Sequence, residues 1–367
     1  MVLNTEFGDD DNKHIIAVND YDSAFFGKLS AEDQALVTED DRKKRQEIGT
    51  KFADDYYDLL TDTIMDGWGE GFHYCRIVPG EPIWQARARH EHYLAHMIGI
   101  TRGANVLECG SGLGGPAREM ARFVECNVTG ISINKYQIGY SRKLTKEVGL
   151  SDKVKFVQGD FMKLPFADNT FDYVYSIEAT AHAPDLNKCY KEIFRVLKPG
   201  GRFGTYEWCM TDAFDAQNAA HCAIRSRIER GNGMSNLFDR AGVRTAMLGA
   251  GFDLLHDEDI HERPLVGGVR WWDVLKGDMS RVVNWRDFYL ILRLTWWVRK
   301  IVYWFAHVME LLHLAPKGIV RTLDVISVTV DSVVEGAEAG IFTPSLLMIG
   351  QKPADGKEEA AKKKKNK

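Results

Sequence analysis

The stretch that decides the fold is Val106-Leu-Glu-Cys-Gly-Ser-Gly-Leu-Gly-Gly-Pro-Ala-Arg118. An apolar run contains an acid near its end, Glu108, and glycines follow at Gly110, Gly112 and Gly114 before a helical pattern begins. Glycine allows positive φ and leaves room for a ligand to approach the backbone. A strand, such a loop and a helix together form a nucleotide-binding turn. The alternative is an ordinary tight turn between a strand and a helix.

The spacing of the glycines and the position of the acid distinguish between two cofactors. Gly110-x-Gly112-x-Gly114 has one residue before its last glycine, where the dinucleotide pattern has two. A pyrophosphate would be repelled by Glu108, whereas the ammonium group of a methionine moiety would pair with it. The stretch therefore favours S-adenosylmethionine over NAD.

The composition is that of an ordinary globular protein. The 367 residues include 47 Lys and Arg and 52 Asp and Glu, a net charge of −5, which gives no reason to expect a nucleic-acid partner. The polar, acidic N-terminus does not resemble a signal peptide, and no run of 18 or more uncharged apolar residues predicts a membrane span. The six cysteines include no CxxC pair, which predicts reduced thiols in a cytosolic setting and no metal site.

Short apolar runs alternate with helical patterns from residue 105 onwards. Strands are expected at 105–109, 127–131, 154–158, 171–177 and 201–207, and helices near 116–123, 135–148 and 186–197. This alternation predicts an α/β fold with a parallel sheet covered by helices on both faces.

Composition shifts divide the chain into five parts. We expect a polar leader with a docking helix at 1–50, a substrate-side segment at 51–100, a cofactor-binding domain at 101–260, a C-terminal substrate-binding domain at 261–353 and a disordered lysine-rich tail at 354–367.

Polar residues at the ends of the next two strands complete the predicted cofactor site. Ser132, with Asn134 and Gln137 nearby, stands where an acid often holds the ribose diol, and these side chains can hydrogen-bond hydroxyl groups without charge. A helix N-cap is an equal alternative for Ser132. Asp160 is predicted to accept a hydrogen bond from the adenine amino group and Phe161 to stack on the ring, with a helix cap as the alternative for Asp160.

Acids and aromatic residues follow the fourth and fifth strands. Glu178 and His182 come after the fourth strand, and Tyr206, Glu207 and Trp208 come at the end of the fifth. A carboxylate wedged between aromatic rings is costly unless it is paired or functional. Glu207 is therefore the first candidate for a catalytic base, together with His182 or Glu178, although a lone histidine is more often structural. Glu178 is also assigned to the cofactor site.

This combination predicts electrophilic alkylation of an apolar substrate. An alkene that attacks a sulfonium methyl becomes a carbocation, which aromatic faces stabilise and from which a base must remove a proton. The candidate bases are Glu207, Glu178, His182 and Asp66, and the candidate rings for the cation are Trp68, Phe72, Tyr206 and Trp208. Tyr206 and Trp208 count among the catalytic candidates, and the four rings and His73 are the candidate substrate contacts. For any single ring, ordinary core packing is the alternative.

Several blocks of sequence, in order over roughly residues 50–353, resemble the sterol side-chain methyltransferases. They include Asp66-Gly-Trp-Gly-Glu-Gly-Phe-His73, Ala88-Arg-His-Glu-His-Tyr-Leu94, Tyr206-Glu-Trp-x-Met-Thr-Asp212 and Gly340-Ile-Phe-Thr-Pro344. The resemblance implies a Rossmann-like, seven-stranded class I methyltransferase sheet with an α+β C-terminal sterol-binding part. It also implies methyl transfer from S-adenosylmethionine to carbon 24 of a sterol, in sterol biosynthesis and without a metal.

One block departs from the family pattern. The family carries a run of the form Phe-Tyr-Glu-Tyr before Gly-Trp-Gly, and here these positions read Thr63-Ile64-Met65-Asp66. The resemblance implicates that run in the sterol pocket, so the preferred substrate and the product stay open. The alternatives are a squalene or triterpene methyltransferase, methylation of nitrogen or oxygen on a small polar acceptor, and a sterol-binding homologue that has lost catalysis.

Residues 285–312 predict one amphipathic helix. At about 100° per residue, a basic stripe with neighbouring tryptophans opposes an aliphatic face. The stripe is Arg286, Arg293, Lys300 and His307 beside Trp297 and Trp304, and the opposite face is Ile291, Val298, Val302, Phe305 and Met309. Such a helix lies at a membrane interface or packs on the protein's own core.

A sterol substrate and the terminal lysines favour the first reading, with peripheral contact at the cytoplasmic face of the endoplasmic reticulum or another membrane. The oligomeric state stays open, a homo-oligomer included.

Overall fold

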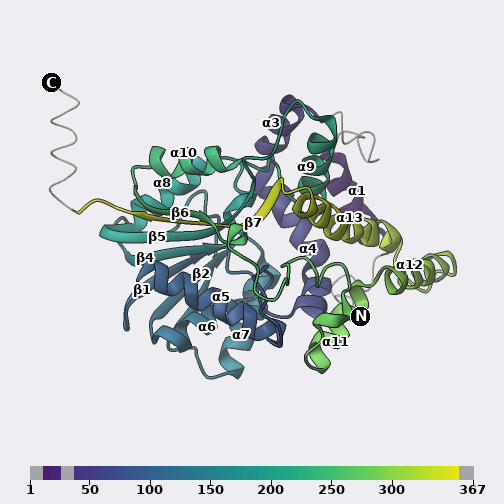
Figure 1. The fold of residues 1–367 in the computed structure, drawn as a ribbon, viewed down its shortest axis with the longest axis horizontal. Helices are drawn as coiled ribbons and strands as arrows, with labels where there is room; N and C mark the ends of the chain where they lie inside the picture. The colour runs from purple at the N-terminus through teal and green to yellow at the C-terminus, as the bar shows by residue number, and fades with distance from the viewer. Residues whose placement is uncertain (1–10, 26–36, 355–367) are drawn as a thin grey trace. The chain divides into compact units, whose positions relative to one another are not determined.

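The computed structural model describes residues 11–25 and 37–354 (Figure 1). The predicted leader falls partly, and the lysine-rich tail almost wholly, outside these residues. Within them the chain forms two compact units, each made of three stretches of sequence. The helical unit comprises Met1–Ala86, Met210–Leu237 and Pro264–Thr343, and the sheet unit comprises Arg87–Cys209, Phe238–Arg263 and Pro344–Lys367.

The sheet unit is built on a seven-stranded sheet of order β3-β2-β1-β4-β5-β7-β6. The strands are β1 (Asn105–Cys109), β2 (Asn127–Ser132), β3 (Val154–Gln158), β4 (Phe171–Ile177), β5 (Leu197–Met210), β6 (Asp253–Asp259) and β7 (Phe342–Gln351). β1 to β5 pair in parallel, and β6 and β7 pair antiparallel. The expected α/β fold is confirmed, and the sheet is mixed at its β7–β6 edge.

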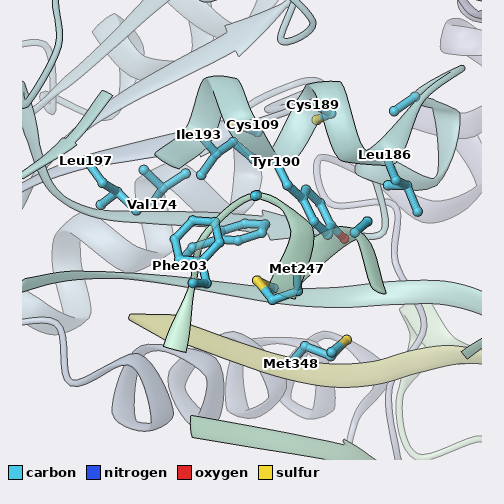
Figure 2. Close-up of a cluster of buried hydrophobic side chains, with 14 of the residues drawn as sticks. Cys109, Val174, Leu186, Cys189, Tyr190, Ile193, Leu197, Phe203, Met247 and Met348 are labelled. Carbon is cyan, nitrogen blue, oxygen red and sulfur yellow. The ribbon is translucent and has the colours of Figure 1, made fainter. Parts of the chain in front are cut away.

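Helices cover both faces of this sheet, because fully buried strands send alternate side chains to opposite sides. The helices are α5 (Ile83–Ile98), α6 (Gly115–Val124), α7 (Lys135–Glu147), α8 (Leu186–Val196) and α10 (Arg240–Gly249), with short 3₁₀ turns η2 (Thr180–His182) and η3 (Ile260–Glu262). Val174 of β4 joins Tyr190, Phe203 and Met247 in a core beneath α8 and α10 (Figure 2). Its neighbour Tyr175 joins the core beneath α5 and α6.

The helical unit has eight helical segments within residues 11–25 and 37–354. They are α1 (Asp11–Ser23), α3 (Glu39–Glu47), α4 (Gly49–Trp68), α9 (Ala219–Gly231), η4 (Met279–Arg281), α11 (Trp285–Leu294), α12 (Trp296–Leu311) and α13 (Ile319–Glu338). α9 and α13 cross closely at Gly231, where an added Cβ would lie 2.6 Å from the backbone nitrogen of Thr329. The C-terminal part is thus helical up to α13 and then gives β7 to the sheet.

The single helix expected over residues 285–312 is wrong. The chain leaves helical geometry at Thr295 (φ −60°, ψ 139°), which ends α11 and precedes α12. The buried Thr295 hydroxyl donates to the carbonyl of Leu292 at 2.6 Å, which is the kind of local bond that competes with continuing the helix. Because of this break, Arg286 and Lys300 do not belong to one continuous stripe. Among residues 11–25 and 37–354, no helix is long and apolar enough to cross a membrane.

A buried ionic cluster ties α3 to α9 within the helical unit. The Glu229 carboxylate is fully buried and meets Arg42 at 2.8 Å, Arg45 at 2.6 Å and Arg225 at 3.2 Å. Burial alone would raise the pKa of Glu229, but the three arginines hold it below its usual value. The cluster therefore keeps Glu229 ionised inside the unit.

We expect Glu229→Gln to lower the free energy of unfolding by ~3–5 kcal/mol, because it leaves buried guanidinium groups without a counter-charge. The matched control is Glu335→Gln. It removes the half-exposed ion pair between Glu335 of α13 and Arg227 of α9, and should lower the free energy of unfolding by less than ~1 kcal/mol. Urea denaturation at pH 7 measures both. Equal losses in the two variants would contradict the assignment.

Candidate active site

The glycine loop after β1 has the geometry that the sequence predicts. Gly110, Gly112 and Gly114 all adopt positive φ, at 76°, 49° and 75°. An added Cβ would overlap Ala179 at Gly110 and Phe156 at Gly114, but would meet nothing within 4 Å at Gly112. The two outer glycines are therefore required by packing, and the middle one leaves open space beside the backbone that a ligand can occupy.

Glu108 lies directly before this loop and is 2% exposed. Its Oε2 atom accepts no hydrogen bond from the part of the chain that the structure describes. Burial raises the pKa of Glu108 well above its usual value, Glu91 adds to the rise, and Arg118 and the hydroxyl of Tyr175 oppose it. A buried carboxylate with an unsatisfied oxygen fits a ligand that brings positive charge or hydrogen-bond donors. S-adenosylmethionine carries both, so the residues present fit this cofactor.

Ser132, Asn134 and Gln137 form the turn between β2 and α7. The Asn134 side chain caps α7 by accepting from the backbone N–H of Gln137 at 3.0 Å. The Ser132 hydroxyl donates to Gln137 Oε1 at 3.0 Å and accepts from the Asn134 N–H at 3.3 Å. The N-cap role weighed for Ser132 thus belongs to Asn134. The structure brings the three predicted residues together, and their contacts with a ribose stay a prediction.

Asp160 and Phe161 follow β3. Asp160 Oδ1 accepts from the Met162 N–H at 2.7 Å, which fixes the turn locally. The residues that follow form a turn and not the helix that the helix-cap alternative requires. Phe161 is half-buried and packs against the core beneath α8. Both residues lie at the carboxyl end of β3, the edge of the sheet at which parallel α/β folds bind ligands.

Glu178 follows β4 in a rare backbone conformation. Its φ is +55°, which side chains other than glycine seldom adopt and which clusters at functional sites. The Glu178 N–H donates to the carbonyl of Tyr206 at 2.8 Å, and the indole Nε1 of Trp208 donates to Glu178 Oε2 at 2.7 Å. The ends of β4 and β5 are thereby joined through a buried carboxylate and an aromatic ring.

The expectation that Tyr206 and Trp208 flank the Glu207 carboxylate is wrong. Successive residues of a strand face opposite sides of the sheet. Tyr206 stacks on His90 of α5, with ring centroids 3.7 Å apart, and Trp208 reaches Glu178.

Glu207 instead faces α8. Its Oε2 atom accepts hydrogen bonds from the Thr180 hydroxyl and from Tyr190 Oη, the latter at 2.9 Å. Burial raises the pKa of Glu207 to about 7, although the bonds from Thr180 and Tyr190 oppose the shift. A carboxylate of this pKa can exchange a proton near neutral pH.

The remaining candidates are divided between the units. His182 is buried in η2, beside Thr180, in the sheet unit. Trp68, Phe72 and His73 belong to the helical unit, as does Asp66 near the end of α4, whose side chain is outside the described residues.

Two further rings extend the Trp68–Phe72 pair. Tyr74 lies 6.2 Å from Trp68 and 6.1 Å from Phe72, and Trp271 lies 5.1 Å from Tyr74, measured between ring centroids. The sequence analysis missed both. Tyr74 stands two residues after Phe72, so the alternation in Phe72-His-Tyr74 was the available signal, whereas nothing in the sequence connected distant Trp271 to it.

Comparison with known proteins gives the family. A methyltransferase-domain model matches residues 107–205, and a sterol methyltransferase C-terminal model matches residues 289–354. The sterol 24-C-methyltransferase of Aspergillus fumigatus is 47% identical over 94% of this chain and 90% of its own length, and that of Saccharomyces cerevisiae is 41% identical over 86% and 82%. The chain belongs to the sterol 24-C-methyltransferase family. It is an S-adenosylmethionine-dependent C-methyltransferase.

Solved structures support the fold of this sterol 24-C-methyltransferase family member. Geranyl diphosphate C-methyltransferase from Streptomyces coelicolor, in complex with S-adenosyl-L-homocysteine, matches with a TM-score of 0.55 at 16% identity, over 84% of this chain and 97% of that chain. A sarcosine dimethylglycine methyltransferase from Galdieria sulphuraria gives 0.57 at 22% identity, over 80% and 97%. The expected class I methyltransferase sheet is confirmed.

Glu207→Gln should change how stability depends on pH. Because the pKa of Glu207 is raised to about 7, the wild type loses stability as pH rises from ~4.5 to ~7, and glutamine does not. We compare the free energy of unfolding of the variant minus that of the wild type. This difference should be ~2–3 kcal/mol more positive at pH 8 than at pH 5. Urea denaturation at both pH values measures this difference. A pH-independent difference would show that Glu207 ionises normally in the folded protein.

Proposed function

We propose that the protein transfers a methyl group from S-adenosylmethionine to carbon 24, in the side-chain double bond of a sterol, as a step of sterol biosynthesis. The observation that carries this proposal is the 40–47% identity to sterol 24-C-methyltransferases over most of both chains. The local structure supports it, because a buried carboxylate beside the glycine loop fits a cationic methyl donor and an acid–indole pair stands at the same sheet edge.

The sheet unit holds the donor in this proposal. When bound, S-adenosylmethionine supplies an electrophilic methyl group. Glu108 offers its unsatisfied oxygen to the methionine part, and the open side of Gly112 leaves room for the ligand. Asp160 would accept from the adenine amino group and Phe161 would stack on the ring. Gly110 and Gly114 hold the loop, and the Ser132, Asn134 and Gln137 turn faces the ribose.

Glu178 is the best supported of the three bases considered within the sheet unit. It is 7% exposed, its oxygen is oriented by Trp208, and it lies on the face that carries Tyr206 and Trp208. The indole can lower the free energy of positive charge on a neighbouring carbon by ~2 kcal/mol when the pair is shielded from water. The Glu178 carboxylate then accepts the proton whose loss restores the double bond.

Glu207 is enclosed on the opposite face, so we assign it a supporting part. It holds the Thr180 hydroxyl and thereby the η2 turn that ends at His182. His182 remains a second candidate for carrying the proton away. Asp66, Trp68, Phe72 and His73 of the helical unit stay predicted catalytic or substrate contacts.

Variants at the two acids and the ring test this division. Glu178→Gln should lower kcat by ~10²-fold or more, because a positioned base contributes that much, while the Kd for S-adenosylmethionine changes less than threefold. A large rise in that Kd would instead place Glu178 among the cofactor contacts. Trp208→Leu should be severe for sterol alkylation, and Glu207→Gln should be the mildest of the three. The measurements are steady-state kinetics and calorimetry.

The substrate class needs its own test because Thr63-Ile64-Met65-Asp66 departs from the family run. Mass spectrometry of products from a panel of Δ24 sterols and from squalene measures specificity directly. We expect methylated sterol, and product from squalene alone would overturn the sterol assignment. Donor and sterol binding without any transfer of a labelled methyl group would indicate a sterol-binding homologue. A nearly harmless Trp208→Leu would favour nitrogen or oxygen methylation of a small polar acceptor.

We also infer peripheral contact with a membrane, at the cytoplasmic face of the endoplasmic reticulum or of another membrane. The support is chemical, because a sterol partitions into lipid and has to be taken from it. A homo-oligomer stays a prediction, which light scattering of the purified protein tests.

A further inference from the structure

Helix α12 packs on α13 through two charged residues and a small apolar contact between them. Arg299 forms a two-pronged ion pair with Asp331 of α13, at 2.7 and 2.8 Å. Glu310 accepts from the backbone N–H groups of Gly318 at 3.0 Å and Val320 at 3.3 Å. Tyr303 and Ala306 pack with Ile319 and Val320 at the start of α13. Positions 299, 303, 306 and 310 lie on one face of a helix, so this face holds α12 in place.

The rest of α12 presents apolar side chains outward. Trp296 is 67% exposed, Trp304 68% and Leu311 78%. The other exposed apolar residues of α12 are Trp297, Ile301, Val302 and Phe305, and Leu312 and Leu314 are exposed in the turn that follows the helix. We call these nine residues the α12 apolar face. A helix at a water-exposed surface normally buries its apolar side, whereas α12 exposes most of its large apolar side chains. Contiguous apolar surface of this kind marks an interaction site.

The charges at the edge of the α12 apolar face are basic. Among the exposed residues of α12 itself, Lys300 and His307 are the titratable ones, and Lys317 is exposed in the turn that follows. The Lys300 ammonium lies 5.1 Å from the centre of the Trp296 ring, so its stem runs along apolar surface while its charge stays at the edge. The acids next to α12 face α13: Asp331 pairs with Arg299, Glu310 accepts from the first turn of α13, and Asp324 lies beside Tyr303.

We propose that the α12 apolar face is the surface by which the protein docks on a lipid bilayer that contains anionic lipid. Tryptophans surrounded by aliphatic side chains and a basic edge fit the region between acyl chains and headgroups. α12 is 16 residues long and carries Arg299, Lys300 and Glu310, which fits lying in the interface and not spanning it.

Charge complementarity favours lipid over a second copy of this chain. Lys300 and His307 have no exposed acid on α12 to meet in a symmetric contact, whereas lipid phosphates and serine headgroups are anionic. The proposal rests on the proposed function in one respect: a sterol substrate resides in a membrane, which gives the protein a reason to bind one.

The test is flotation of the full chain with vesicles of phosphatidylcholine alone and with 30% phosphatidylserine. We expect flotation with both and more with phosphatidylserine. Trp304→Ser/Phe305→Ser should reduce flotation at least tenfold on both vesicles. Lys300→Glu should reduce only the gain that phosphatidylserine gives. Phe123→Ser on α6 is the matched control, because Phe123 is 53% and Phe305 57% exposed, and it should float as the wild type does.

Several outcomes would overturn the docking surface. One is equal flotation of the wild type and the double variant, confirmed with a second pair, Leu311→Ser/Leu312→Ser. Another is no flotation of the wild type combined with a lower mass of the double variant in sedimentation, which would make the face a contact between copies.

Methyl transfer to a sterol delivered on cyclodextrin reports the proposed function separately. We expect the double variant to keep that activity and to lose transfer to sterol embedded in vesicles. If the wild type transfers no methyl group to sterol in the cyclodextrin assay, the proposed function is contradicted. The flotation result would not be affected by that outcome.

Discussion

The buried carboxylate at the end of β1 is the constraint on which the site depends. Glu108 is enclosed between the strands and helices of the sheet unit, and burial with Glu91 nearby makes its ionised form costly. A positively charged ligand offsets that cost, which couples cofactor choice to the fold. The glycine loop beside this acid is constrained by packing at Gly110 and Gly114, and at Gly112 the absence of a side chain leaves space beside the backbone. Overlap with Ala179 and Phe156 at the outer glycines shows how little room the loop leaves.

The sequence was sufficient for the sheet, because its evidence is local. Each apolar run, its polar end and the helix that follows are close together in the sequence, and β1 to β4 lie where expected, whereas β5 begins at Leu197, before the expected residue 201. The Glu207 site shows where this reasoning stops. Because Tyr206 and Trp208 are adjacent to Glu207 in the sequence, they were expected to flank its carboxylate. In the strand, however, the Glu207 side chain points to the opposite face, toward α8. The true partners, Thr180 and Tyr190, are 27 and 17 residues away. Only the pairing of β4 with β5 and the crossing of α8 bring them together.

The helical unit was harder to predict, since its key contacts join distant segments. Arg42 and Glu229 are 187 residues apart, and neither position carries a motif. Because three arginines surround one carboxylate, the ionised state of Glu229 is set by the tertiary fold. The break at Thr295 is similar. A helical wheel over 285–312 assumes continuity, and a single β-branched residue with a local hydrogen bond ends it. The wheel therefore found amphipathic character but assigned some residues to the wrong stripe.

The orientation of α12 leaves large apolar side chains in contact with water. Fully burying one large apolar side chain is worth ~1.5–3 kcal/mol, so exposing several to water forgoes a large stabilisation. Rotating α12 about its axis would recover part of it. The observed orientation is instead held by Arg299 on Asp331 and by Glu310 on the first turn of α13, which are directional contacts that no rotated helix could keep. In α12, Arg299 and Glu310 hold the helix in place and the tryptophans point outward. This arrangement is suited to contact with an apolar medium such as the acyl-chain region of a bilayer.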